Sequence, residues 1–218
     1  MYPEANIQFQ KPVRKRARRQ GATSQDHVLD AAASLIAGGD ASALTCSSLA
    51  MLLHIRPPSL YKHFESLDAV RDGLAVRALK ELTELARAAI CGRSGRDALE
   101  ALADAQRVYA HANPGMYEVA VRRAAVNSPD SSRALEAFLR VELATLRAYG
   151  LTPDEAARMS RCLRASIWGF ISLELRDPHA TSFEADQSFD RLIDILDSGA
   201  RLTAKAQTVG LKLALASA

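Results

Sequence analysis

The chain has 218 residues, of which 48% are hydrophobic and 24% are charged. This length allows one large domain or two small ones, and this share of apolar residues is enough to form a hydrophobic core. No apolar run approaches the roughly 20 residues that span a membrane, and the N-terminus lacks the apolar stretch of a signal peptide. We therefore expect a cytoplasmic protein without membrane contact.

The formal net charge of +3 is unevenly distributed along the chain. Residues 1–64 carry eight Lys or Arg against four Asp or Glu, whereas the remainder has one more acid than base. A cationic N-terminal segment on a nearly neutral chain favours an anionic partner such as DNA at that end.

The first 22 residues are expected to form a flexible basic arm. They contain a dense group of cations and show no hydrophobic period. Its candidate DNA contacts are Arg14, Lys15, Arg16, Arg18 and Arg19. Such an arm can lie on phosphates or enter the minor groove, which adds salt-dependent affinity. A disordered, solubilising tail is the alternative.

The first helix is predicted to begin near Ser24, which can cap it, and to end at Gly38 and Gly39. Two shorter helices with a tight turn between them are predicted in residues 44–64. Apolar residues recur at helical spacing up to Leu53 and again from Leu60, with an interruption between them. The first helix supports these two helices.

The second short helix is predicted to begin at Pro57 and Pro58, because proline fits the first helical turn, where N–H groups have no partner. Pro57 also keeps Arg56 out of the α region, so the preceding helix must end before it. Leu60 shares one face with Phe64. The opposite face is small, polar and basic, as a helix in the DNA groove requires.

The pairs Leu44-Thr45 and Leu49-Ala50, and above all the run Leu60-Tyr61-Lys62-His63-Phe64, resemble the N-terminal helix-turn-helix of the tetracycline-repressor (TetR) family of bacterial transcription regulators. The resemblance is clear over roughly residues 23–74. It implies a DNA-binding domain at 23–66 and a C-terminal regulatory and dimerisation domain at 67–218.

Three positions differ from the family pattern. His54 replaces the usual turn glycine, at a position that often requires a positive φ. Arg56 replaces a small hydroxyl residue that caps the recognition helix, so that cap is expected to be missing. Leu67 replaces a phosphate-binding lysine.

The resemblance implies a set of DNA contacts. Tyr61 and His63 are expected to bond phosphates, while Arg56, Ser59 and Lys62 are the candidates for base edges. The expected DNA-binding residues are Thr45, Ser47, Arg56, Pro57, Pro58, Ser59, Tyr61, Lys62 and His63. Packing roles for the aromatic ring and the imidazole, and a capping role for Thr45, are the alternatives.

The rest of the chain is predicted to be helical, which makes the protein all-α with about nine helices. No alternation typical of strands appears. The helices are expected at about 66–91, 96–112, 114–126, 130–149, 153–176 and 186–206, the last one possibly longer.

Residues 109–121 and 168–174 resemble a regulatory domain that recurs in this family, with Trp168 where a His is common. A ligand pocket between its helices is expected to involve Tyr109, His111, Met116, Tyr117, Phe138 and Trp168. A dimer interface is expected at Leu163, Ile167, Phe170, Ile171, Leu175, Phe189, Leu192, Ile193 and Leu196. Ordinary core packing is the alternative for both groups.

These features predict a dimeric repressor that binds a palindromic operator in double-stranded DNA and is released by a small, mainly apolar effector. A DNA-binding or architectural protein without an effector is the alternative. No nucleophile–base pair, metal-ligand set or phosphate loop indicates an enzyme, a metal or a cofactor. Cys46, Cys91 and Cys162 lack ligand spacing and are expected to be buried or incidental thiols, with a redox or metal role as the alternative.

Overall fold

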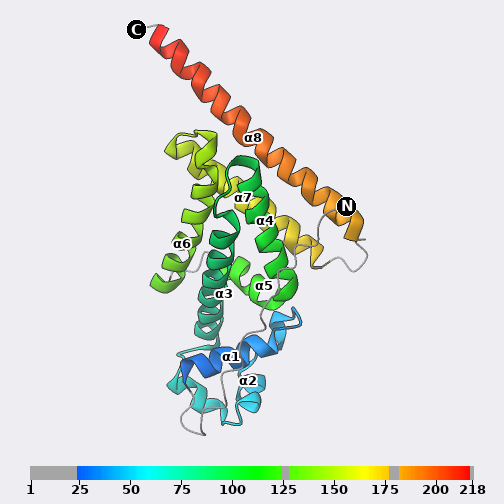
Figure 1. The fold of residues 1–218 in the computed structure, drawn as a ribbon. Coiled ribbons are helices and arrows are strands. Elements are labelled where there is room, and N and C mark those ends of the chain that lie inside the picture. The colour runs from blue at the N-terminus through cyan, green and yellow to red at the C-terminus, as the bar shows by residue number, and fades with distance from the viewer. Residues whose placement is uncertain (1–23, 124–127, 177–181, 217–218) are drawn as a thin grey trace.

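The computed structural model describes residues 24–123, 128–176 and 182–216, and every regular element in these ranges is helical (Figure 1). The elements are α1 (Gln25–Leu35), η1 (Ala41–Ala43), α2 (Cys46–Leu52), η2 (Pro57–Lys62), α3 (Leu67–Ile90), α4 (Gly95–Ala112), α5 (Pro114–Arg123), α6 (Pro129–Leu146), η3 (Arg147–Tyr149), α7 (Pro153–Glu174) and α8 (Ser182–Ala216). The all-α prediction is confirmed, and the expected helices correspond to α1, α2, η2 and α3 to α8. No helix in the described ranges is long and apolar enough to cross a membrane.

The helices begin where hydroxyl side chains can cap them. The Ser24 hydroxyl accepts a hydrogen bond from the His27 amide, and Ser66 accepts one from Ala69 in the same way. These caps satisfy amides that have no partner in a first helical turn. The predicted helix starts therefore agree with the structure, whereas α8 runs well beyond both of its predicted ends.

Helix α3 is the centre of the molecule and packs against α1, α4, α5 and α6 (Figure 1). Its residues Val70, Leu74, Leu79 and Leu82 are buried in one hydrophobic cluster that also contains residues of α1, α2, η2 and α4 to α8. The core therefore continues from the N-terminal helices into the large helical body without a break.

Polar contacts hold the N-terminal helices on α3. The Arg77 guanidinium of α3 lies 2.6 Å from the Asp30 carboxylate of α1. Arg71 of α3 donates a hydrogen bond of 3.1 Å to the Leu44 carbonyl, just before α2. Gly73 allows α3 to approach α1 closely, because a Cβ added to this glycine would lie 2.9 Å from the Leu29 side chain of α1.

Helix α5 meets the C-terminal end of α1 through backbone contact. A Cβ added to Gly115, in the first turn of α5, would lie 1.8 Å from the Ile36 carbonyl oxygen. No side chain fits in that space, so only glycine permits this approach. This contact is a second link between the N-terminal helices and the rest of the chain.

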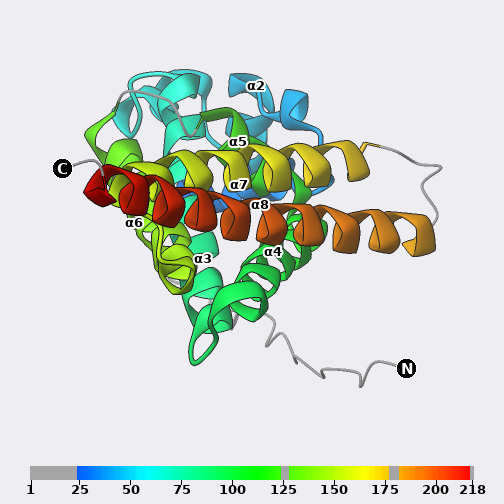
Figure 2. The same cartoon turned by 90° about the horizontal axis from the view of Figure 1, so that it is seen from above.

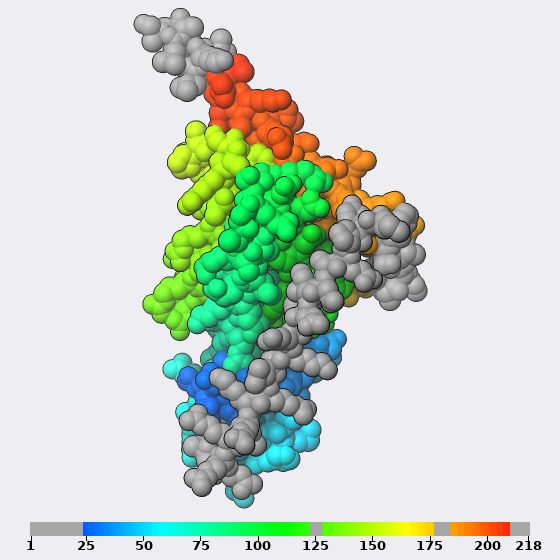
Figure 3. All heavy atoms as spheres, viewed as in Figure 1, coloured from blue at the N-terminus to red at the C-terminus, as the bar shows by residue number. Residues whose placement is uncertain are grey.

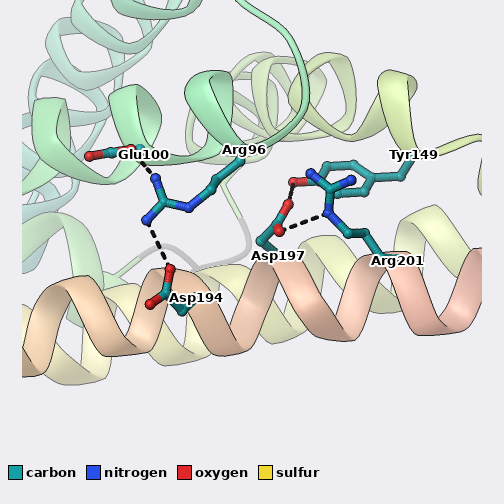
Figure 4. Close-up of polar contacts among 6 residues, drawn as sticks. All are labelled: Arg96, Glu100, Tyr149, Asp194, Asp197 and Arg201. Atoms are coloured by element: carbon teal, nitrogen blue, oxygen red, sulfur yellow. Dashed lines mark hydrogen bonds and ion pairs between the residues drawn. The ribbon is translucent and has the colours of Figure 1, made fainter.

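Helices α7 and α8 lie side by side (Figure 2), and the C-terminal part of α8 extends beyond the helical body (Figure 3). Ion pairs and hydrogen bonds fasten α8 to the other helices (Figure 4). Arg96 of α4 lies 2.9 Å from Asp194 of α8, and the Tyr149 hydroxyl of η3 donates a 2.7 Å hydrogen bond to Asp197. The position of α8 is therefore fixed near its middle.

A buried carboxylate joins α6 to α7. Glu142 is 1% exposed and accepts hydrogen bonds from the Ser160 hydroxyl and, at 2.8 Å, from the Arg164 guanidinium. Burial raises the pKa of Glu142 to about 7, although both hydrogen bonds oppose the rise. The folded protein therefore holds a proton here that the unfolded chain would release near pH 4.5.

We expect this carboxylate to make the folded protein less stable as the pH rises. Stabilisation by the retained proton is complete below pH 4.5 and is lost as the pH passes about 7. The free energy of unfolding, measured by urea denaturation across this range, should fall with rising pH. Glu142→Gln should reduce that slope, whereas Glu136→Gln, an exposed site on the same helix, should not. Equal slopes in all three proteins would contradict the assignment.

The contact between α5 and α1 predicts that Gly115→Ala is strongly destabilising. The added methyl group collides with backbone, and overpacking of this kind costs about 1–3 kcal/mol. We expect the free energy of unfolding from urea titration to fall by about that amount. Gly38→Ala is the matched control because its Cβ would meet nothing within 4 Å. A Gly115→Ala protein as stable as the control would show that the approach is looser than described.

Candidate nucleic-acid interface

Helix α2 is fixed at its start by a reciprocal cap. The Thr45 hydroxyl accepts a hydrogen bond from the Ser48 amide, and the Ser48 hydroxyl accepts one from the Thr45 amide, both at 3.0 Å. Leu49 and Ala50 are buried on the inner face, while Ser47 is exposed on the outer face. The capping role predicted for Thr45 is confirmed, and its exposed position leaves it open to a partner.

The turn after α2 contains a left-handed residue. His54 has φ of 54°, as expected for a position where the TetR family usually has glycine. Histidine tolerates this conformation better than most side chains, at some cost in strain. The turn amides are satisfied, because His54 donates to the Met51 carbonyl and Ile55 donates to the Ala50 carbonyl.

The expected recognition helix is η2, a six-residue 3₁₀ helix and not an α-helix. Ser59 donates to the Arg56 carbonyl and His63 donates to the Leu60 carbonyl, which are bonds between residues three apart. Arg56 is extended and makes no side-chain cap, as its sequence position predicted. With two prolines at the start and no cap, the segment forms only this short, tight helix.

The side chains of η2 divide into a buried and an exposed set. Leu60 is buried in the core and Phe64 packs against it. Tyr61 is 57% exposed, and its hydroxyl lies 3.8 Å from the Cys46 sulfur of α2. His63 is half-buried, and its carbonyl accepts a hydrogen bond from Gln25. Packing alone does not account for Tyr61, whereas both interpretations of His63 stay open.

Two free cations lie on this surface. Arg56 and Lys62 are exposed, and within the described ranges neither forms an ion pair. Pro57 and Pro58 are exposed beside them, and Ser59 is half-buried. The basic arm at 1–22, with Arg14, Lys15, Arg16, Arg18 and Arg19, lies outside the described residues.

Most residues of the expected ligand pocket are core residues. Tyr109 donates to Glu81 at 2.7 Å, and the Trp168 indole donates to the buried Gln106 at 2.8 Å. The Trp168 ring packs on Phe138, whereas His111 is exposed and lies 3.4 Å from Glu174. Met116 and Tyr117 are also buried. These contacts agree with the alternative of ordinary core packing, and the expected pocket stays a prediction.

The structure has a half-open pocket of about 270 Å³ at another place, between the end of α1, helix α5 and the end of α7. Tyr117 is the residue of the expected set that lines it. The pocket is also lined by Gly38, Glu118, Arg122 and Arg176, which were not predicted from the sequence. No periodicity connects these residues, because they come from three separate segments.

The expected dimer interface stays a prediction, but most of its residues already pack within the single chain. Leu163, Ile167, Ile171, Phe189, Ile193 and Leu196 are buried within the single chain, and Phe170, Leu175 and Leu192 pack half-buried against the same core. These faces of α7 and α8 cover the helical body. Among the residues of these two helices whose side chains the structure describes, the large apolar ones that are exposed are Leu173, Ile195, Leu202 and Val209.

The prediction of buried thiols is corrected. Cys46 is half-buried, and Cys91 and Cys162 are exposed; all three are free. The exposed positions of Cys91 and Cys162 agree with the interpretation that these thiols are incidental.

Comparisons with known proteins agree with this architecture. A family model described as "Tetracyclin repressor-like, C-terminal domain" matches residues 99–196. The HTH-type transcriptional regulator YobS of Bacillus subtilis is 30% identical over 176 residues, covering 80% of this chain and 86% of YobS. The HTH-type transcriptional regulator Rv0681 of Mycobacterium tuberculosis is 27% identical over 162 residues, 74% of each chain.

Solved structures share the fold. ActR from Streptomyces coelicolor has a TM-score of 0.68 at 17% identity and covers 86% of this chain and 99% of its own. BioQ with its double-stranded DNA operator has a TM-score of 0.62 at 20% identity, covering 83% and 99%. A TetR variant from Acinetobacter baumannii with minocycline has a TM-score of 0.58 at 20% identity, covering 85% and 96%.

The likeness to these structures concerns the fold, and the sequence relatives define the family. The match to YobS is long enough to include both N-terminal residues and the C-terminal helices. The chain therefore belongs to the TetR family of DNA-binding, helix-turn-helix transcriptional regulators.

Proposed function

We propose that this regulator is a homodimeric repressor that binds a palindromic operator through η2 and is released by a small effector. The observation that carries the proposal is the division of η2, with Leu60 held in the core and Arg56, Tyr61 and Lys62 turned to solvent. A short segment that presents a phenol hydroxyl and two cations, neither of which forms an ion pair with a described residue, is suited to duplex DNA.

The roles within the interface follow from side-chain chemistry. Tyr61 and His63 bond phosphates and fix the register, together with Thr45 and Ser47 at the start of α2. Arg56 hydrogen-bonds to a base edge, because a guanidinium can form two hydrogen bonds with guanine. Ser59 and Lys62 can hydrogen-bond to different base edges. Pro57 and Pro58 provide apolar contact to a thymine methyl group. The basic arm at 1–22 adds affinity that depends on salt.

Two structural relatives support the partners that we propose. BioQ is known with its double-stranded DNA operator, and the A. baumannii TetR variant is known with minocycline. The same fold thus holds DNA in one protein and a small molecule in another. We infer the same two classes of partner for this chain.

A dimer follows from the size of η2 and from the surface of α8. One six-residue helix reads too few base pairs for a specific site, whereas a two-fold pair reads two half-sites. Ile195, Leu202 and Val209 are exposed at intervals of seven residues, so they lie along one face of α8. We propose that this face, with Leu173 of α7, packs against the same face of a second chain.

The proposed phosphate contacts predict a loss of DNA affinity. Tyr61→Ala together with His63→Ala should weaken binding at least about tenfold, because hydrogen bonds to charged groups contribute about 1.5–3 kcal/mol each. Fluorescence anisotropy with a duplex selected from random DNA by the wild-type protein measures this. Lys80→Gln, an exposed site on α3, is the control. Unchanged affinity of the double variant, with the fold intact by circular dichroism, would rule out η2 as the recognition element.

The proposed interface predicts that Ile195→Glu with Leu202→Glu separates the subunits. Carboxylates introduced at these two positions would be buried without partners in the dimer, which is unfavourable. In the single chain both positions are exposed to solvent and tolerate a charge. Sedimentation should give twice the subunit mass for the wild type and one subunit for the variant. Val108→Glu, an exposed apolar site on α4, should remain a dimer. A dimeric double variant would place the interface elsewhere.

A further inference from the structure

We propose that the pocket between the end of α1, helix α5 and the end of α7 is the effector site, and that it takes a small monocarboxylate with an apolar body. This inference rests on the proposed function for its regulatory meaning, although the site itself is independent of DNA. Its volume of about 270 Å³ lies just below the usual range of about 300–1,000 Å³ for ligand pockets, so the ligand is small.

The charges that line the pocket select an anion. Arg122 of α5 and Arg176, just after α7, both approach Oε1 of Glu118, at 2.7 and 3.4 Å. One carboxylate oxygen cannot accept hydrogen bonds from all the donors of two guanidinium groups, because each group has five N–H donors. The three side chains leave one positive charge in excess. A ligand carboxylate can therefore bond the remaining donors, and planar guanidinium groups are well suited to this geometry.

An unsatisfied hydroxyl provides a second and independent indication. Tyr117 lines the pocket and is 1% exposed, and its hydroxyl has no hydrogen-bond partner within the described chain. Buried polar groups normally have a hydrogen-bond partner, and a group without one destabilises the folded protein. A polar atom of the ligand can satisfy this hydroxyl. Pro114, Val121 and Leu175 supply apolar contacts for the body of the ligand.

The position of the pocket couples the ligand to the DNA-binding helices. Gly38 and Gly39 follow α1 and line one side, while α5 and the end of α7 line the others. Helix α5 also touches the Ile36 carbonyl through Gly115. A ligand bound between these elements stabilises one particular distance of α1 from α5 and α7. Since α1 packs against α2 and α3, that distance bears on the position of η2.

Isothermal titration calorimetry of the full chain with benzoate, cyclohexanecarboxylate and octanoate tests the site, with benzyl alcohol as an uncharged comparison. We expect at least one carboxylate to bind and the alcohol to bind at least about tenfold more weakly, because the charged hydrogen bonds are lost. Failure of all three carboxylates, or equal binding of the alcohol, would overturn the assignment.

Variants locate the bound probe. Arg122→Gln with Arg176→Gln should weaken carboxylate binding at least about tenfold, and Arg176→Lys less, because the charge remains. Tyr117→Phe removes the unsatisfied hydroxyl without changing the ring and should also weaken binding. Arg158→Gln is the matched control, since Arg158 is on α7 with similar exposure and does not line the pocket. Thermal denaturation checks the fold, and undiminished binding by the folded arginine variant would overturn the site.

A separate measurement tests the regulatory role. Anisotropy titrations with the selected duplex, with and without the carboxylate, should show a lower DNA affinity when the carboxylate is bound. Calorimetry should show that the duplex lowers the affinity for the carboxylate by the same factor. A carboxylate that binds without any change in DNA affinity overturns the effector role but leaves the site. If the protein binds no DNA, the proposed function fails, whereas calorimetry still decides whether the site exists.

Discussion

The burial of Leu60 in the core is the interaction on which the proposed DNA-binding surface depends. A six-residue 3₁₀ helix has little stability of its own, and η2 has no side-chain cap to add to it. Leu60, with Phe64 beside it, anchors the segment in the same apolar cluster that contains Leu49 of α2 and Leu74 of α3. The position of Arg56 and Lys62 is thus set mainly by the hydrophobic packing of the segment that carries them.

Elements with local signals could be predicted from the sequence. Ser24 and Thr45 cap helices where their positions predicted, and these caps depend on neighbouring residues alone. The positive φ of His54 agrees with what the family resemblance implied for its place in the turn. The 3₁₀ form of η2 was not predicted, because helical spacing over eight residues does not distinguish it from an α-helix.

Features that depend on distant residues were missed. The apolar stripes of α7 and α8 were correctly found, but amphipathicity does not reveal whether a stripe faces the same chain or a second one. Burial assigns Ile167 and Ile193 to the core and leaves Leu173 and Ile195 on the surface. The pocket near Arg176 was likewise invisible, because its lining comes from three segments that only the fold brings together.

The continuous core limits how the proposed effector can act on the N-terminal helices. A closely packed interior does not deform gradually. A ligand bound near α1 therefore shifts this helix between discrete packing arrangements or does not shift it at all. Ion pairs such as Arg77–Asp30 keep α1 on α3, which makes the two move together. Helix α5 also contacts α1 directly, since a Cβ added to Gly115 would lie 1.8 Å from the Ile36 carbonyl oxygen. In the proposed effector mechanism, a shift of α5 is therefore passed to α1 through this backbone contact.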